Sequence, residues 1–373
     1  MAWLPKIALG TEKYPGLTGI RALGAIAVFF DHFPVWPGAH ITINVLAFFF
    51  VLSGFLIVRV YYERAELNRL WLAKYFANRF ARIYPVYFLL LSVAVCLHHD
   101  FSPWVLLANY TLLHALFYQT DIIIQPTWSL TVEECFYLLA PAFMILTRRY
   151  HFTAAFALAS LMLLAALGIS KLDSVFLHTP MFVLSTTFFG HFVEFFAGVY
   201  LALAVLKVEK SGPIEAPGVK FTLTGLAGVV VLLAAMLAVY HHPPANHFGL
   251  TIVLINNFLI PLPIVLLYWG LIRENTILAR LLSHNVFGLL GRSSYSFYVL
   301  HMLSIDYIGV PLLSYMGGYR SAVVVLTFVL SWAIAVLLFV CYEEPLNLFL
   351  RRKFRSQARS VGMQATLFQV NRE

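Results

Sequence analysis

The sequence has few charged residues and few cysteines. Only 11% of its 373 residues are Asp, Glu, Lys or Arg, and 61% are apolar, whereas a soluble domain has about 25% and about 45–50%, respectively. Its three cysteines are far apart in apolar segments, so they predict neither a disulfide framework nor a metal site. This composition excludes a soluble enzyme.

Apolar residues occur in blocks of roughly twenty, and these blocks lack the alternation of a lipid-facing barrel strand. An outer-membrane barrel is therefore excluded as well. We predict an all-α, polytopic membrane protein with about ten transmembrane helices. The predicted spans are 17–33, 43–62, 83–99, 127–147, 152–170, 186–206, 221–240, 248–271, 294–316 and 321–341.

The polar stretches between these blocks are short. Even the longest, such as 59–82 and 207–220, stay below the ~40 residues that a separately folding unit usually needs. We therefore expect one transmembrane domain, 1–350, followed by a basic cytoplasmic tail, 351–373, and no appended soluble domain. The first apolar run has no small-residue cleavage site after it, so no removable signal peptide is expected.

Basic residues indicate the orientation in the membrane. With the N-terminus inside, Lys171 and Arg320 are the two of the 25 Lys and Arg that fall outside, as the positive-inside rule requires. Both termini are then cytoplasmic. The same rule explains the net charge of +8 without nucleic-acid binding. Segment 103–118 is apolar but short and lacks basic flanks, so we expect a re-entrant or interfacial element on the outer side.

Two ionisable residues lie in the first span. His32 follows Arg21 by eleven residues, or ~16 Å of helix, which places it well into the bilayer or its outer half. An ionisable group at that depth is costly and is a candidate for function. Alternatively, Arg21 is a snorkelling anchor and His32 is a histidine bonded to a neighbouring carbonyl.

Two arginines lie three residues apart after the second span. Arg79 and Arg82 share one helical face, and two guanidinium groups on one face form a fork suited to phosphate. The phosphate belongs either to lipid headgroups or to a phosphate-bearing cosubstrate.

Two carboxylates begin the fourth predicted span, just beyond Trp128. Thr131 and Glu134 have the spacing of a capping box, which gives Glu134 a structural explanation. Glu133 has none. A carboxylate near the outer end of the helix that carries His32 would orient an imidazole or bind a sugar hydroxyl.

Further polar groups lie in other spans. Tyr298 is near a span end, where tyrosines usually form an interfacial belt, and His301 is a second histidine in an apolar run. Ser53 and Gly54 suggest either a nucleophile or close helix packing, and we favour packing because small residues in spans usually serve it.

Five motifs follow one another in order along the chain. They are RALGAIAVFFDH (Arg21 to His32), FFFVLSGF, the paired arginines of NRFARIYP, WSLTVEECFY and SYSFYVLH. In that order the sequence resembles the acyltransferase 3 family over nearly its whole length. Members of this family are membrane enzymes that O-acylate bacterial surface glycans and related acceptors. The ending Glu343-Glu344-Pro345 is similar to the family's Glu-x-Pro, with an acidic middle residue where a basic one is common.

The resemblance implies an enzyme of the bacterial inner membrane. It would take an acyl group, commonly acetyl, from cytoplasmic acyl-CoA and deliver it to an outer hydroxyl of a surface glycan such as lipopolysaccharide O-antigen. The bilayer, acyl-CoA and the glycan are the implied partners, without a metal. Matching positions give Arg21, His32 and Glu133 as catalytic candidates and Arg79 and Arg82 as coenzyme-binding candidates. Trp128, Glu134, Tyr298 and His301 are substrate-binding or structural candidates.

In this interpretation His32 is the general base, because the ordinary pKa of histidine lies nearest neutral pH. Glu133 positions either His32 or the acceptor, and Arg21 holds the pantetheine arm or the thioester carbonyl. Direct transfer and an acyl-histidine relay both remain open. A proton-coupled transporter with His32, Glu133 and His301 as its relay is the alternative from another class. A membrane-bound O-acyltransferase of the histidine/asparagine type is a lesser one, since its characteristic pairing is not apparent.

Overall fold

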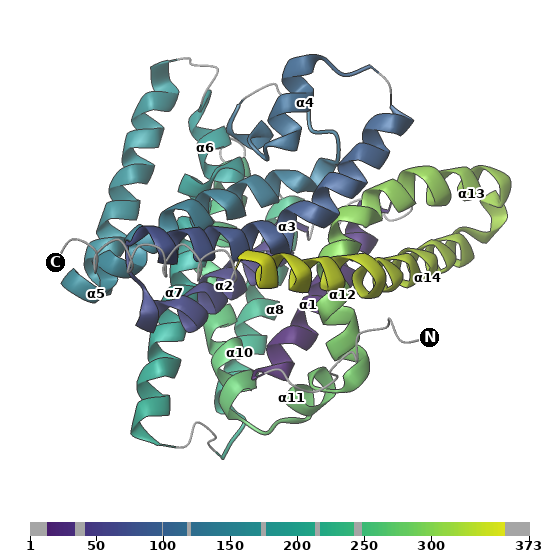
Figure 1. The fold of residues 1–373 in the computed structure, drawn as a ribbon. Coiled ribbons are helices and arrows are strands. Elements are labelled where there is room, and N and C mark those ends of the chain that lie inside the picture. Colours follow the sequence, from purple (N-terminus) through teal and green to yellow (C-terminus); the bar gives the residue numbers. More distant parts are fainter. Residues whose placement is uncertain are drawn as a thin grey trace.

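The computed structural model describes residues 13–33, 42–98, 100–117, 121–172, 177–212, 217–241 and 248–354. Within these ranges the chain is helical and has no β-strand (Figure 1). The helices are α1 (Pro15–His32), α2 (Thr42–Tyr61), α3 (Arg69–Leu97), α4 (Pro103–Tyr110), α5 (Trp128–Ile169), α6 (Pro180–Thr186), α7 (Phe188–Ser211), α8 (Lys220–His241), α9 (Phe248–Leu254), α10 (Pro261–Arg273), α11 (Ile277–Leu282), α12 (Asn285–Ser304), α13 (Val310–Tyr315) and α14 (Arg320–Leu338). Three π-helical segments, Ile255–Leu259, Ile305–Gly309 and Phe339–Glu343, continue α9, α12 and α14.

Eight helical stretches of the described residues are long and apolar enough to cross a membrane. One of them, Gln125–Leu172, is 48 residues long and holds two predicted spans, because the backbone leaves the helical conformation at Tyr150 (φ −131°) and His151 (φ +68°). The shorter α1, which contains Arg21, matches the remaining predicted span. The polytopic all-α fold is thus confirmed, and its helices correspond to the ten predicted segments.

The segment predicted not to cross the membrane, 103–118, is a short helix and turns in its described residues, 103–117. Helix α4 has 8 residues, or ~12 Å, against a hydrocarbon core of about 30 Å. The buried Asn109 fixes this segment. Its amide nitrogen donates to the carbonyls of Val105 (2.9 Å) and Asp121 (2.8 Å), and its amide oxygen accepts from the backbone N–H of Ile123 (3.1 Å). An irregular backbone is tolerated here because its polar groups are paired within the protein.

The loops predicted to be cytoplasmic meet at one end of the helix bundle. Lys13, before α1, and Arg59, at the end of α2, both form ion pairs with Glu209 near the end of α7, at 2.8 and 2.6 Å. Lys210 forms another with Glu63 at 2.8 Å. These contacts agree with the predicted topology, in which the three helix ends share one side of the membrane. The side itself stays a prediction.

A second polar cluster joins Glu274, between α10 and α11, to the start of α8. Its carboxylate accepts hydrogen bonds from the backbone N–H groups of Phe221 and Thr222 (both 2.8 Å) and from the Thr222 hydroxyl (2.7 Å). Burial raises the pKa of Glu274, but these hydrogen bonds outweigh it and hold the pKa below its usual range. The charged carboxylate therefore stabilises the N-terminus of α8.

The predicted boundary between the transmembrane domain and the tail falls inside a helical stretch, which continues from Arg320 to Phe354. Residues 355–373 of the tail, like residues 1–12, lie outside the described residues.

Close helix contacts bring the site-bearing helices together. A Cβ added to Gly54 would lie 2.0 Å from the carbonyl oxygen of Phe195, and one added to Gly198 would lie 1.9 Å from that of Val51. Helices α2 and α7 thus pack backbone to backbone, which confirms the packing role predicted for Gly54. Helices α1 and α12 are also neighbours (Figure 1), and a Cβ on Gly291 would lie 2.0 Å from the carbonyl oxygen of Thr18.

Candidate functional site

One cavity, which we call the site cavity, collects most of the charged residues singled out in the sequence. It has a volume of about 120 Å³ and lies among α1, α2, α3, α5 and α12. Arg21, Arg79, Arg82, Glu133 and Tyr298 line it, together with apolar side chains. Ionisable residues from four helices, separated by up to 277 positions, therefore face one cavity.

Glu133 is held by hydroxyl groups. Its carboxylate accepts hydrogen bonds from Ser53 on α2 and from Tyr137, one turn further along α5. Ser53 also lines the site cavity. The sequence analysis weighed a nucleophile against packing at Ser53-Gly54 and favoured packing, so a hydroxyl of Ser53 that donates to Glu133 is an addition to that interpretation. Paired in this way, Glu133 presents a fixed acceptor to the cavity. No hydrogen bond joins it to His32 in the part of the chain that the structure describes.

Arg79 lies between two aromatic rings. Its guanidinium carbon is 5.6 Å from the ring centroid of Tyr61 and 5.5 Å from that of Tyr137, a cation–π arrangement that gains strength away from water. Its Nε atom is buried and has no hydrogen-bond partner among the described residues. The rings hold the charge in place and leave a donor group for a ligand.

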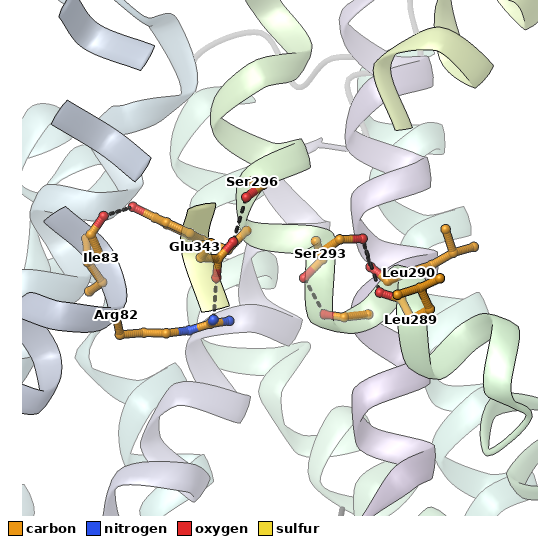
Figure 2. Close-up of polar contacts among 10 residues, drawn as sticks. Arg82, Ile83, Leu289, Leu290, Ser293, Ser296 and Glu343 are labelled. Carbon is orange, nitrogen blue, oxygen red and sulfur yellow. Dashed lines mark hydrogen bonds and ion pairs between the residues drawn. The ribbon is translucent and has the colours of Figure 1, made fainter. Parts of the chain in front are cut away.

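Arg82 is joined to a residue that the sequence analysis gave no role. Its guanidinium pairs with Glu343, at the end of the π-helical segment after α14, and the other carboxylate oxygen of Glu343 accepts from the Ser296 hydroxyl of α12 at 2.6 Å. Figure 2 shows Glu343 joined to Arg82 and Ser296 by these contacts. On the same helix, the Tyr295 hydroxyl donates to the carbonyl of Ile83 at 2.7 Å. Glu343 is 2% exposed. The pair thus connects α3, α12 and α14 at the wall of the site cavity.

The two histidines face each other. The ring centroids of His32 on α1 and His301 on α12 are 5.1 Å apart, with an interplanar angle of 61°. The Nδ1 of His32 is 2.8 Å from the carbonyl oxygen of Val28, and that of His301 is 2.6 Å from the carbonyl oxygen of Tyr298. Carbonyl oxygens only accept, so Nδ1 carries the proton in both rings, and Nε2 of the neutral ring keeps a lone pair.

His32 is thus bonded to a neighbouring carbonyl, as the alternative structural interpretation predicted, and its Nε2 is still free to act as a base. The Nε2 of His301 is buried and has no hydrogen-bond partner among the described residues.

Tyr298 stands between the histidines and the site cavity. Its ring lines the cavity and is 5.7 Å from the ring of His301. Its hydroxyl donates to the carbonyl of Pro126 at 2.7 Å and lies 2.7 Å from the Ser129 hydroxyl. Neither histidine lines the cavity itself, whereas the ring of Tyr298 lines it and packs against His301.

The capping box expected at Thr131 and Glu134 is not formed. A 3-10 turn, Gln125–Thr127, leads into α5, which therefore begins at Trp128 and has no side-chain cap. Both residues then lie inside the helix, and neither Thr131 Oγ1 nor Glu134 Oε1 has a hydrogen-bond partner among the described residues. Capping is thus the wrong explanation for Glu134. The ring of Trp128 packs against that of the buried His191, with centroids 5.8 Å apart.

The site cavity adjoins a wider space toward the end that carries the basic loops. This space, the entrance cavity, has a volume of about 390 Å³ and shares Arg21, Leu52 and Leu56 with the site cavity. At its other end it is lined by Lys13 and Arg59. Cations thus line both cavities, from Lys13 and Arg59 at the basic end of the bundle to Arg79 and Arg82. The described residues contain no group of three or more His, Cys, Asp or Glu side chains that would hold a metal ion.

Comparisons with known proteins identify the family of the chain. The family model described as an acyltransferase domain, acyltransferase 3, matches residues 14–340. The peptidoglycan O-acetyltransferase OatA of Listeria monocytogenes is 31% identical over 157 residues, which are 36% of this chain and 25% of that protein. The matched part thus spans about a quarter of that relative's length. No solved structure matches the chain.

Proposed function

The chain belongs to the acyltransferase 3 family, and from this premise we propose that it is a membrane O-acetyltransferase. It moves an acetyl group from cytoplasmic acetyl-CoA to a hydroxyl of a glycan outside the bacterial inner membrane. The observation that carries the proposal is the site cavity, which gathers Arg21, Arg79 and Arg82 and continues toward the basic end of the bundle. The paired histidines lie beyond its other side.

The chemistry assigned to His32 is that of a general base. Its Nε2 takes the proton of the acceptor hydroxyl while the hydroxyl oxygen attacks the thioester carbonyl. The carbonyl oxygen becomes an oxyanion, while Arg21, roughly 16 Å along α1 from His32, holds the pantetheine arm of the donor. Collapse of this intermediate breaks the carbon–sulfur bond, and the thiolate of coenzyme A leaves and takes up the proton from His32. In a relay, Nε2 would instead attack the thioester itself and carry the acetyl group to the acceptor.

The buried His301 and the hydroxyl-bonded Glu133 fit supporting roles. His301 packs against the ring of His32 and fixes its orientation. Glu133, with Ser53 and Tyr137 as its partners, is placed to accept a hydrogen bond from a sugar hydroxyl. The sequence suggested that Glu133 positions either His32 or the acceptor, and this proposal takes the acceptor.

The acceptor is a surface glycan in this proposal, with lipopolysaccharide O-antigen as the first candidate. The name of the relative from Listeria makes peptidoglycan the second. Mass spectrometry of both glycans, from cells with and without the protein, tests the proposal. We expect one acetyl mass added per modified sugar, on one of the two. Unchanged glycans and lipids, together with solute flux in proteoliposomes that consume no acetyl-CoA, would support the transporter instead.

Arg79 and Arg82 are assigned to the diphosphate of the coenzyme. We expect Arg79→Lys and Arg82→Lys each to raise the KM for acetyl-CoA about ten- to a hundredfold, because a charge-assisted hydrogen bond contributes ~1.5–3 kcal/mol and Lys lacks the planar fork of Arg. The measurement is titration of purified, detergent-solubilised protein with acetyl-CoA. Arg149→Lys is the matched control, because Arg149 lines neither cavity. An unchanged KM in both variants would indicate that these arginines do not bind the donor.

A further inference from the structure

A closed network of four side chains lies at the end of the entrance cavity that is away from the site cavity. Glu209 Oε1 accepts from the Lys13 ammonium and the Tyr14 hydroxyl, both at 2.8 Å, and Glu209 Oε2 pairs with Arg59 at 2.6 Å. The Nε of Arg59 also donates to the Tyr14 hydroxyl at 2.8 Å. Two cations and a hydroxyl, from the start of α1 and the end of α2, therefore converge on one anion.

The position of this network distinguishes it from an ordinary surface ion pair. Lys13, Tyr14 and Arg59 line the entrance cavity. A further cavity of about 590 Å³ on the other side is lined by Lys13, Tyr14, Glu209 and Arg280. The network thus lies between the entrance cavity and this wider cavity, which share Lys13 and Tyr14 as lining residues.

Spacing along α1 matches the parts of the proposed donor. Tyr14 precedes Arg21 by seven residues, roughly 10 Å of helix, and Arg21 precedes His32 by roughly 16 Å. If the diphosphate lies beside Arg79 and Arg82, the pantetheine arm extends toward His32. The adenosine then extends the other way, and its ribose 3′-phosphate comes to the level of Tyr14.

Resting on the proposed function, we propose that Lys13, Tyr14 and Arg59 form the binding site for the 3′-phosphate of acyl-CoA. Glu209 occupies this site while the donor is absent. A phosphate monoester carries a charge of about −1.5 to −2 near neutral pH, so it attracts the two cations more strongly than a single carboxylate does. The side chain of Glu209 is 21% exposed and turns toward water in the wider cavity when it is displaced. The site thereby selects coenzyme A over donors that lack the 3′-phosphate.

Calorimetric titration with coenzyme A and with 3′-dephospho-coenzyme A tests the proposal without an acceptor. We expect the full-length, detergent-solubilised wild type to bind coenzyme A about ten- to a hundredfold more tightly than the dephospho form. Arg59→Gln should abolish this difference by weakening only the binding of coenzyme A. Lys13→Gln should reduce the difference, and the 58% exposure of the Lys13 side chain makes misfolding of that variant a minor concern. Lys210→Gln is the matched control, since it breaks a neighbouring ion pair that faces neither cavity.

Glu209→Gln should change the affinity for coenzyme A in the opposite direction. We expect this variant to bind coenzyme A several-fold more tightly, because it removes the competing anion. A purely structural network predicts instead that Glu209→Gln and Arg59→Gln lower the thermal midpoint and leave the ratio between the two coenzymes unchanged. An unchanged ratio, which a site for lipid headgroups would also give, overturns the proposal.

Turnover of acetyl-CoA is measured separately. The expected binding pattern without acyl transfer would refute the proposed function and retain the phosphate site. Acyl transfer with an unchanged ratio of the two coenzyme affinities would support the proposed function and refute the phosphate site. A wild type that binds neither coenzyme refutes both.

Discussion

Replacing His32 by Ala is expected to lower the rate of acyl transfer by about 10²- to 10⁴-fold, the usual contribution of a positioned general base. The imidazole is half-buried at the end of α1, and its Nδ1 donates to the carbonyl of Val28. Removal of the imidazole leaves that carbonyl in its place within the helix and creates only a small cavity in the core. The loss should therefore appear in turnover, while the amount of folded protein and its thermal midpoint stay close to those of the wild type.

Two companion variants sharpen this test. His32→Gln keeps a polar side chain but has no basic nitrogen, so it should be almost as inactive as His32→Ala. His98→Ala is the matched control, because His98 is an exposed histidine that bonds the Tyr307 hydroxyl at 2.6 Å and does not line the site cavity. Near-normal turnover by either His32 variant at normal expression would mean that His32 is a packed histidine without a catalytic role.

Removing the carboxylate of Glu343 should cost about 1–3 kcal/mol of folding free energy, since it leaves the half-buried guanidinium of Arg82, whose side chain is 23% exposed, without its partner. Glu343→Ala also removes the acceptor of the Ser296 hydroxyl and the link from α14 to α3. The measurement is denaturant unfolding of the detergent-solubilised protein. Glu63→Ala breaks an exposed ion pair of the same kind and should change the stability little.

The double replacement Arg82→Met with Glu343→Met separates stability from function. Apolar side chains of similar volume often replace a buried ion pair without loss, so the double variant should unfold at a denaturant concentration near that of the wild type. Its affinity for acetyl-CoA should still fall, because Arg82 lines the site cavity. A double variant that is both stable and fully active would show that the pair has a structural role alone.

The sequence predicted the fold and the set of cavity residues for one physical reason. Ionisable groups are rare in apolar helices, so Arg21, Arg79, Arg82 and Glu133 stand out from the amino-acid pattern alone, and all four face one cavity. The partners of these groups could not be predicted in the same way. Glu343 follows α3 by more than 240 positions, and Ser53 resembles any small residue of a packed span.

The spacing of residues along one helix did not predict every local contact. Thr131 and Glu134 have the spacing of a cap, but the turn at Gln125–Thr127 moves the helix start upstream and leaves both inside α5. The contact of Lys13 with Glu209 brings together residues 196 positions apart. Such a contact depends on how α1, α2 and α7 end relative to one another, which periodicity within each helix does not determine.

The break in α5 has a consequence for how the protein enters the bilayer during synthesis. Tyr150 and His151 are the two residues at which the chain leaves the helical conformation, so the helices on either side have no loop between them. A first helix inserted alone would hold the start of the second at the membrane surface, where its apolar face stays in water. We therefore expect these two helices to leave the insertion machinery together as one hairpin, with Arg148 and Arg149 retained on the side of the ribosome.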